Sequence, residues 1–413
     1  MSDDQPTRDT DSVSTRRRVL QAAGAAGLAG ALGVAGWTGR LIYLMGQNER
    51  ACLGTDDPDR SRVSGPSAAD LPAERLLAEL DRYSAERSDV GLQACAVLED
   101  GTGWRGVAGN ADHDDVPLSL AHQLYVGSVT KLYTATLVLD LVQRGDLSLS
   151  ETLDEWVDLE YAGDVTVEML LNHTSGVPNY TSDAWFVARY FGLPRRTWEP
   201  GDLLEVIRGS SLRFAPGARH EYSNSNYVLL GVVLEAVTGE PYRALVRRLV
   251  REEAGFDRTY YLDYPGDARI ANGYDESIFD LGRRNLTAFR ESLETGAYAA
   301  GGILSTAPDV AGFVRALFTG EILTEATLSW MRTFVDAEDE DVPTQRGYGL
   351  GVRNLVIDGR SLVGHTGTIP GYSAIAMHHD DPEYTIAVLS NLSTIDQTGV
   401  FGRLQNAVLN EFY

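Results

Sequence analysis

Lysine is almost missing from this chain of 413 residues. Lysine and arginine together number 35, and Lys131 is the single lysine among them. Lysine is normally one of the commonest residues, so about two dozen would be expected in a chain of this length. Codon bias, or adaptation to high salt through an acidic surface poor in lysine, would explain why lysine is missing elsewhere. Neither explains why one lysine remains.

Cysteine and positive charge are also scarce. The two cysteines, Cys52 and Cys95, are too few for a disulfide framework or a cysteine-based zinc site. The 35 basic residues stand against 59 acidic ones, and the net charge is −24. Binding to nucleic acid or to an anionic membrane surface depends on basic side chains, so this balance disfavours both partners. We expect no nucleic-acid partner, no metal site and no cofactor.

Residues 1–46 resemble a targeting segment rather than part of a fold. Arginines at positions 16–18 precede a run of Ala, Gly and Leu, and apolar character continues at 41–45. A basic segment before an apolar stretch is typical of an export signal, and paired arginines are typical of the twin-arginine type. An uncleaved membrane anchor and an ordinary amphipathic helix are the alternatives. We predict an extracytoplasmic protein, secreted or membrane-anchored, with a disordered tether at 47–69 and a folded domain at 70–413.

The folded part shows strand patterns near both of its ends and helical patterns between them. Residues 128–330 are mostly helix and loop. The strand patterns lie at 90–99, 103–108, 361–364, 372–378 and 384–389, between a first helix at 72–87 and a last one at 394–411. This order predicts an α/β sheet domain with an inserted helical subdomain and a site at their junction.

Ser128 and Lys131 lie at the start of a predicted helix that ends at Gly145. Apolar residues cover every side of this helix, which indicates that it is buried all round. The two side chains are three residues apart and therefore share one face. Burial depresses the pKa of a lysine, so that it can take a proton from a neighbouring hydroxyl. The pair indicates an activated serine nucleophile at a helix N-terminus that favours negative charge.

Two further segments carry candidate site residues. Tyr222 and Asn224 lie two residues apart in a predicted loop before a helix, and a phenol near a lysine can shuttle protons. An Asn/Ser turn with a packed tyrosine is the alternative. The glycine-bearing segment 364–368 is predicted on a strand edge, where its N–H groups can bind an oxyanion. An ordinary glycine-rich strand is the alternative there.

The order Ser-x-x-Lys, Tyr-x-Asn and His-Thr-Gly resembles the class C β-lactamase and DD-peptidase superfamily of serine hydrolases. Further matching segments lie at 170–178, 227–231, 300–306 and 347–351, and the resemblance covers about residues 71–413. It implies an α/β (α+β) fold of the β-lactamase/transpeptidase type. In that fold an antiparallel sheet is flanked by N- and C-terminal helices and joined to a helical subdomain.

The same resemblance implies the roles of the site residues. Ser128 would be the acylated nucleophile, and Lys131 and Tyr222 would share the general-base role. Asn224 would orient Lys131 and the substrate amide. The backbone N–H groups of Ser128 and of Thr368, which follows Gly367, would form the oxyanion hole.

His365 departs from the pattern of true β-lactamases, which usually carry a lysine at this position of the third motif. A neutral imidazole can donate a hydrogen bond to substrate but lacks the full positive charge of lysine. This departure shifts the expectation from β-lactams toward esters and peptide-like amides. A consequence is that activity should fall as the pH drops through about 6.5 and the ring becomes charged.

We therefore expect an exported, cofactor-free serine hydrolase that acts through an acyl-enzyme on a small-molecule or peptide-like amide or ester. A catalytically silent binding or scaffold protein with the same fold is the alternative, against which the intact Ser128, Lys131 and Tyr222 count. The substrate and the oligomeric state are left open by the sequence. Of the other polar residues, His173 and the pair His378 and His379 are expected in turns, and Cys95 is expected as a buried apolar residue.

Overall fold

The computed structural model describes residues 73–88, 90–112, 116–277, 282–338 and 342–412. The predicted signal or anchor, the predicted tether and Cys52 lie outside these residues. Among the helices of the described ranges, none has both the length and the hydropathy that a membrane span requires.

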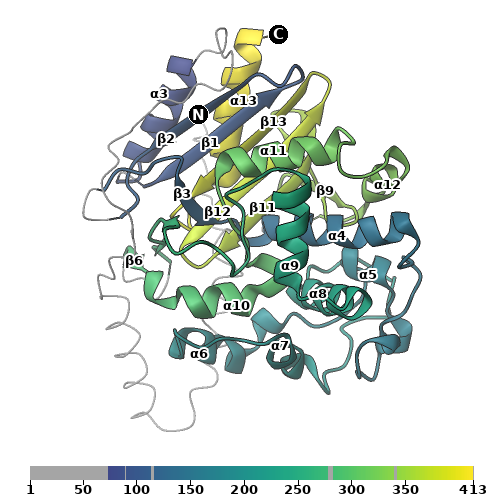
Figure 1. Cartoon of the computed structure of the whole chain (residues 1–413). Coiled ribbons are helices and arrows are strands. Elements are labelled where there is room, and N and C mark those ends of the chain that lie inside the picture. Colours follow the sequence, from purple (N-terminus) through teal and green to yellow (C-terminus); the bar gives the residue numbers. More distant parts are fainter. Residues whose placement is uncertain (1–72, 89, 113–115, 278–281, 339–341, 413) are drawn as a thin grey trace, which may run out of the picture.

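The centre of the molecule is an antiparallel sheet of eight strands in the order β2-β1-β13-β12-β11-β10-β9-β8 (Figure 1). Strands from the two ends of the chain lie side by side near one edge of the sheet, because β1 pairs with β13 from Leu92 opposite Ser390 to Leu98 opposite Tyr384. The strands are β1 (Leu92–Leu98), β2 (Gly103–Ala108), β8 (Val335–Asp336), β9 (Gln345–Tyr348), β10 (Arg353–Ile357), β11 (Arg360–Ile369), β12 (Tyr372–Asp380) and β13 (Glu383–Ser390).

Helices cover both faces of this sheet. The terminal helices α3 (Ala73–Ala85) and α13 (Gln397–Phe412) pack together on one face, and α11 (Ala307–Phe318) crosses the other (Figure 1). Alternate side chains of β13 enter the two cores: Ile386 and Val388 pack with α3 and α13, whereas Ala387 and Leu389 belong to the core on the α11 side. The strand is therefore apolar nearly throughout, as expected for a sheet with both faces covered.

The remaining helices form a subdomain beside the α11 face. They are α4 (Thr130–Arg144), α5 (Val167–Leu171), α6 (Ala184–Gly192), α7 (Pro200–Ile207), α8 (Asn224–Thr238), α9 (Tyr242–Arg247), α10 (Arg290–Gly301) and α12 (Glu325–Met331). Short strands connect them: β3 (His122–Tyr125) lies between β4 (Arg269–Ile270) and β7 (Leu304–Ser305), and β5 (Tyr274–Asp275) pairs with β6 (Arg284–Asn285). Helix α4 is buried on nearly every side and ends at Gly145, whose φ of 80° suits glycine. These observations confirm the predicted sheet domain with inserted helices.

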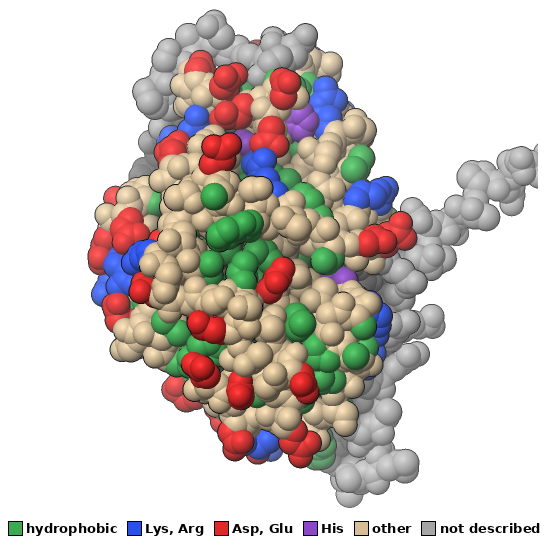
Figure 2. Space-filling view, turned by 90° about the vertical axis from the view of Figure 1, so that its right-hand side faces the viewer, with side chains coloured by type: hydrophobic (Ala, Val, Ile, Leu, Met, Phe, Trp, Pro, Cys, Tyr) green, Lys and Arg blue, Asp and Glu red, His purple; other side chains and the backbone are tan. Residues whose placement is uncertain are grey.

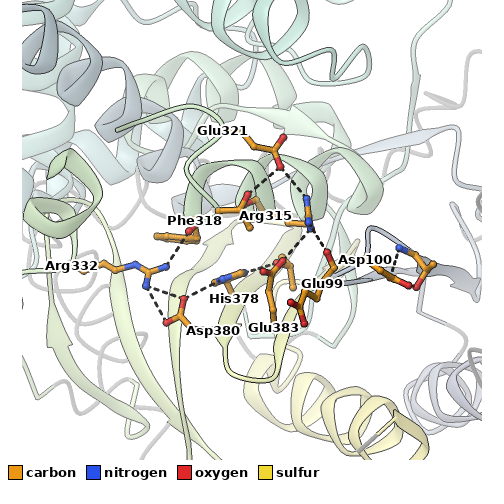
Figure 3. Close-up of polar contacts among 12 residues, drawn as sticks. Glu99, Asp100, Arg315, Phe318, Glu321, Arg332, His378, Asp380 and Glu383 are labelled. Atoms are coloured by element: carbon orange, nitrogen blue, oxygen red, sulfur yellow. Dashed lines mark hydrogen bonds and ion pairs between the residues drawn. The ribbon is translucent and has the colours of Figure 1, made fainter. Parts of the chain in front are cut away.

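Ion pairs attach the helices to the end of the β12–β13 hairpin (Figure 3). Arg332, which follows α12, donates to both carboxylate oxygens of Asp380 at 2.9 and 3.0 Å. On α11, Arg315 lies 3.4 Å from a carboxylate oxygen of Glu383. His378 bonds Thr385 across the hairpin at 2.8 Å, so His378 and His379 lie on strand β12 and not in the turn where they were expected; the turn follows at residues 381 and 382.

Candidate active site

Ser128 lies in a tight connection between β3 and α4. The 3₁₀ turn Gly127–Val129 makes this connection, and Gly127 has a φ of 53°, a value that glycine adopts without strain. Gly127 and Val129 are buried, whereas Ser128 is half-buried and borders a cavity. The turn therefore presents the serine hydroxyl at the start of a rigid, buried helix.

Lys131 lies one helical turn after Ser128 and is fully buried. Its Nζ lies 3.0 Å from Ser128 Oγ, 2.8 Å from Asn224 Oδ1 and 2.7 Å from the backbone oxygen of Ala300. An amide oxygen and a carbonyl oxygen can only accept hydrogen bonds, whereas a hydroxyl can also donate one. A neutral lysine has two N–H groups for Asn224 and Ala300 and one lone pair left for the Ser128 O–H.

The surroundings of Lys131 favour this neutral form. Burial holds the pKa of Lys131 well below its ordinary value of 10.5, and the nearby guanidinium of Arg353 lowers it further. The neutral amine, which can accept a proton from Ser128, is thus favoured. The predicted Ser128–Lys131 pair is present in the structure, with a geometry suited to proton transfer.

Asn224 is the first residue of α8 rather than a loop residue, which corrects the sequence-based assignment. Its backbone N–H bonds Asn179 Oδ1 at 3.2 Å, and its side-chain NH₂ group donates to Thr181 Oγ1 at 3.2 Å. These two contacts leave Asn224 Oδ1 for Lys131. The segment that precedes α6 therefore fixes the orientation of the Asn224 amide.

Tyr222 precedes α8, as predicted, and its ring lies beside the side chains of Lys131 and Arg353. Its ring centroid is 5.0 Å from Lys131 Nζ and 5.1 Å from Arg353 Cζ. The His173 ring packs against the Tyr222 ring, and their centroids are 4.3 Å apart. The structure therefore brings Ser128, Lys131, Asn224 and Tyr222 into one cluster.

Gly367 and Thr368 lie on β11, beside the nucleophile turn. Strand β10 pairs with β11 only as far as Gly364, so the following residues have one free strand edge. A Cβ atom on Gly367 would lie 2.0 Å from the backbone oxygen of Val126, and one on Gly127 would lie 2.8 Å from the backbone nitrogen of Thr368. Only glycines permit this contact of backbone with backbone. The N–H groups of Thr368 and Ser128 are thus brought to the same edge of the cavity.

His365 occupies a different environment from the one predicted. The ring is fully buried; its Nδ1 donates to the backbone oxygen of Thr366 at 2.5 Å, and its Nε2 lies 2.9 Å from the hydroxyl of Tyr348. Because Nδ1 carries the proton, Nε2 accepts from Tyr348, and no ring nitrogen is left for substrate. Burial and the charge of Arg353 hold the pKa of His365 well below 6.5. The expected contact with substrate and the expected loss of activity near pH 6.5 are therefore withdrawn.

Several residues of the site were missed by sequence reasoning. Gln397, the first residue of α13, donates to the backbone oxygen of Gly367 at 2.7 Å and to Thr368 Oγ1 at 3.0 Å. Buried Arg353 bonds the side chain of Gln345 and lies beside Tyr222. Ala300 contributes its backbone carbonyl, which every residue type has, so it cannot be recognised from the sequence. Arg353 lies on β10, where the sequence pattern predicted no strand, so the sequence reasoning had no signal for it.

A cavity of about 270 Å³ opens beside Ser128. It lies between the nucleophile turn, helices α6 and α10, the start of α8 and the end of β11. Its lining residues are Ser128, Tyr180, Thr181, Phe186, Val187, Tyr190, Phe191, Asn224, Gly296, Ala297, Ala300, Gly301, Thr368, Ile369 and Pro370. The cavity beside Ser128 therefore lies at the junction of the sheet domain and the helical subdomain, where a site was predicted.

The other polar candidates have structural surroundings. His173 has a φ of 60° and is fully buried, and its Nδ1 accepts from Asn226 Nδ2 at 3.0 Å and from the Ser223 N–H at 3.3 Å. It holds the loop of Tyr222, as expected for a turn residue. Buried Cys95 has its pKa raised to about 12 by desolvation. Within the described ranges, no cluster of His, Cys, Asp and Glu could hold a metal ion.

Comparisons with known proteins agree with this architecture. Penicillin-binding protein 4* of Bacillus subtilis (strain 168) is 28% identical over 67% of this chain and 62% of its own length. Esterase EstB of Burkholderia gladioli is 29% identical over 74% of this chain and 86% of its own length. The structure of D-amino acid amidase from Ochrobactrum anthropi SV3, complexed with L-phenylalanine amide, matches with a TM-score of 0.73 at 26% identity, covering 82% of this chain and 99% of that chain.

The family assignment rests on most of the chain. This chain spans 62%, 66% and 58% of the lengths of three curated relatives, the first of which is Penicillin-binding protein 4*. The sequence profile of the family described as Beta-lactamase matches residues 78–409. The fold expected from the resemblance is confirmed, and the chain belongs to the beta-lactamase family.

Proposed function

We propose that this protein is an exported serine hydrolase that cleaves an amide or ester through an acyl-enzyme on Ser128. The observation that carries the proposal is the hydrogen-bonding pattern of Lys131. Its two acceptor-only partners leave a lone pair for the Ser128 hydroxyl, and its lowered pKa makes that lone pair available. A serine held in this way is an activated nucleophile.

In the proposed reaction, Ser128 Oγ attacks the scissile carbonyl carbon while its proton passes to Lys131, assisted by Tyr222. The N–H groups of Ser128 and Thr368 stabilise the oxyanion that forms. The amine or alcohol leaves with the returned proton, and an ester remains on Ser128. Water, deprotonated by the same groups, then attacks this ester, releases the acid and restores the serine.

The experiment is labelling with a fluorophosphonate probe, followed by intact mass measurement. The wild-type protein should gain the mass of one phosphonyl group, and a Ser128→Ala variant should gain none. Ser175, which is buried and bonds Asn226, provides a control serine whose replacement by alanine should leave labelling in place. A folded wild-type protein that does not label would favour the silent binding protein and overturn the proposal.

Export is supported by the arginines at 16–18 and the apolar run that follows them. Replacing these arginines with lysine keeps the charge but removes the twin-arginine pattern. The altered precursor should accumulate in the cytoplasm of a host with a twin-arginine pathway, whereas unchanged export would exclude this route. Fractionation with an antibody against the folded domain measures the outcome.

A further inference from the structure

We propose that the Ser128 cavity accepts a compact, uncharged, apolar acyl group and selects against acyl groups that carry an ammonium or a carboxylate. This inference rests on the proposed function and names the substrate class of that site. It follows from the residues that line the cavity and from what their polar atoms already bind.

Aromatic rings make up one wall of the cavity. Phe186 and Phe191 come from α6, as does Tyr190, and Tyr180 lies just before that helix. A Cβ atom on Gly296 of α10 would lie 2.7 Å from a ring carbon of Tyr190, so this glycine lets the ring pack directly on the helix. The wall is therefore rigid as well as apolar.

The hydroxyl groups of the two tyrosines are turned to the protein. Tyr180 donates to the backbone oxygen of Gly296 at 2.6 Å, and Tyr190 donates to that of Leu293 at 3.3 Å. Both bonds end on α10, so the polar ends of these side chains are already satisfied. What the tyrosines offer an occupant of the cavity is ring carbon.

None of the described residues that line the cavity is Asp, Glu, Lys, Arg or His. The basic residues nearby do not line the cavity: Lys131 is fully buried against Ala300, and Arg353 packs against Tyr222. His365, which was expected to donate a hydrogen bond to substrate, is bound to Tyr348 and Thr366 instead. A charged acyl group would thus lose its hydration without gaining a partner of opposite charge.

The size of the cavity limits the acyl group. Drug-sized ligands occupy pockets of about 300 to 1,000 Å³, and this cavity of about 270 Å³ falls just below that range. A phenylacetyl group or a short branched alkyl group suits such a volume. Each CH₂ group that is buried contributes about 0.8 kcal/mol, or about fourfold in kcat/KM.

The test is a set of esters that share one leaving group, 4-nitrophenol, and differ in the acyl part. Acetate and phenylacetate measure the apolar contribution. The D- and L-phenylglycine esters add one ammonium to phenylacetate, and the phenylmalonate half-ester adds one carboxylate. Rates are measured at about pH 6, where both added groups are charged, and are divided by the uncatalysed rate of each ester.

The kcat/KM for phenylacetate should be at least about tenfold higher than that for acetate. It should be at least about a hundredfold higher than that for each charged ester. The variants Val187→Asp and Val187→Asn form a matched pair at the cavity wall. The aspartate should raise the rate of the phenylglycine esters relative to phenylacetate, whereas the equally large asparagine should not.

Charged esters that match phenylacetate in the wild type would overturn the inference, as would an unchanged ranking in Val187→Asp. Fluorophosphonate labelling separates this failure from that of the proposed function. If the protein labels on Ser128 but ranks the esters differently, the hydrolase assignment stands and the proposed substrate class is refuted. A protein that neither labels nor hydrolyses any ester loses both.

Discussion

At the scale of single residues, the protonation state of Lys131 decides whether Ser128 can react. Arginine is the cation used elsewhere in this chain, so positive charge alone would not require a lysine here. A lysine buried at this position reaches its neutral form, whereas arginine, with a pKa above about 12, does not. The single lysine of the chain is thus explained by a need for a proton acceptor.

The substitution Lys131→Arg should therefore lower the rate of Ser128 acylation by at least about a hundredfold, the usual scale for loss of a general base. Lys131→Met, which removes the amine with little change in bulk, should have a similar effect. Stopped-flow measurement of fluorophosphonate labelling gives the rate, and circular dichroism confirms the fold. Near-normal acylation by a folded Lys131→Arg protein would show that the lysine is only an electrostatic partner.

The positive charge of Arg353 influences whether Lys131 is protonated. Because a nearby positive charge disfavours protonated Lys131, Arg353 lowers the pKa of that amine. In Arg353→Gln the pKa of Lys131 should rise, and the acidic limb of kcat/KM should move to higher pH. Each unit of this shift lowers the rate below the limb about tenfold.

Arg353→Lys keeps the charge and should restore the wild-type limb. A purely structural role would lower the rate equally at every pH and leave the limb in place, and that result would contradict the assignment. His365 should contribute no limb near pH 6.5, because burial and the charge of Arg353 hold its pKa well below that value.

At the scale of elements, the contact of β11 with the nucleophile turn depends on Gly367. A methyl group at this position would collide with the backbone oxygen of Val126 and approach the nitrogen of Ser128 to 2.9 Å. Gly367→Ala should therefore displace the oxyanion hole and lower kcat about a hundredfold, as expected for a displacement of about 1 Å. Gly201→Ala, where no atom lies within 4 Å of the added Cβ, should keep wild-type kcat. Equal kcat values in the two variants would refute this role of the contact.

The hairpin contact in Figure 3 contributes to stability in a defined pH range. The bond with His378 and the charge of Arg332 lower the pKa of Asp380 from 3.8 to about 2. Folding thus favours the ionised form of Asp380. Its contribution to the free energy of unfolding is therefore present above about pH 4 and is lost as the pH falls toward 2. Because the Asp380 side chain is 61% exposed, solvent screening limits this contribution to about 1 kcal/mol or less.

Asp380→Asn should lower the melting temperature at pH 7, and its difference from wild type should shrink below pH 4. Asp381→Asn removes the same charge one residue further along, at an exposed carboxylate outside the ion pairs of the described residues, and should change stability less. Differential scanning calorimetry at pH 7 and pH 3 measures both variants. A difference that stays constant across this range would exclude the Asp380 ion pair as its source.

Contacts between sequence neighbours could be predicted, and contacts between distant segments could not. The spacing of Ser128 and Lys131 determines their common face because both lie on one helical turn. The third partner of Lys131 is a carbonyl 169 residues away, and only the folded packing of α10 brings it there. His365 was misplaced for a related reason: the motif identified the strand but not that its ring is buried against Tyr348.

At the scale of the whole molecule, acidic charge dominates the folded part. Residues 1–72 contain 9 acidic and 8 basic residues, so nearly all of the net charge of −24 belongs to residues 73–413. Figure 2 shows acidic side chains spread over one face, with fewer basic ones between them. Many of the arginines lie in exposed ion pairs, which stabilise a protein only slightly. Repulsion among the remaining carboxylates therefore opposes folding at low ionic strength.

Added salt should raise the melting temperature of the folded domain above its value in dilute buffer. The Debye length falls from about 30 Å at 0.01 M to about 10 Å at 0.1 M and about 3 Å at 1 M, so screening acts mainly over the first few hundred millimolar. A steep rise in that range followed by a plateau is the expected curve for potassium chloride. Sucrose, which stabilises proteins by exclusion from their surface without screening charge, serves as the control and should give no such early rise. An unchanged or lower melting temperature in molar potassium chloride would mean that repulsion is negligible, and codon bias would then be the better explanation for the missing lysines.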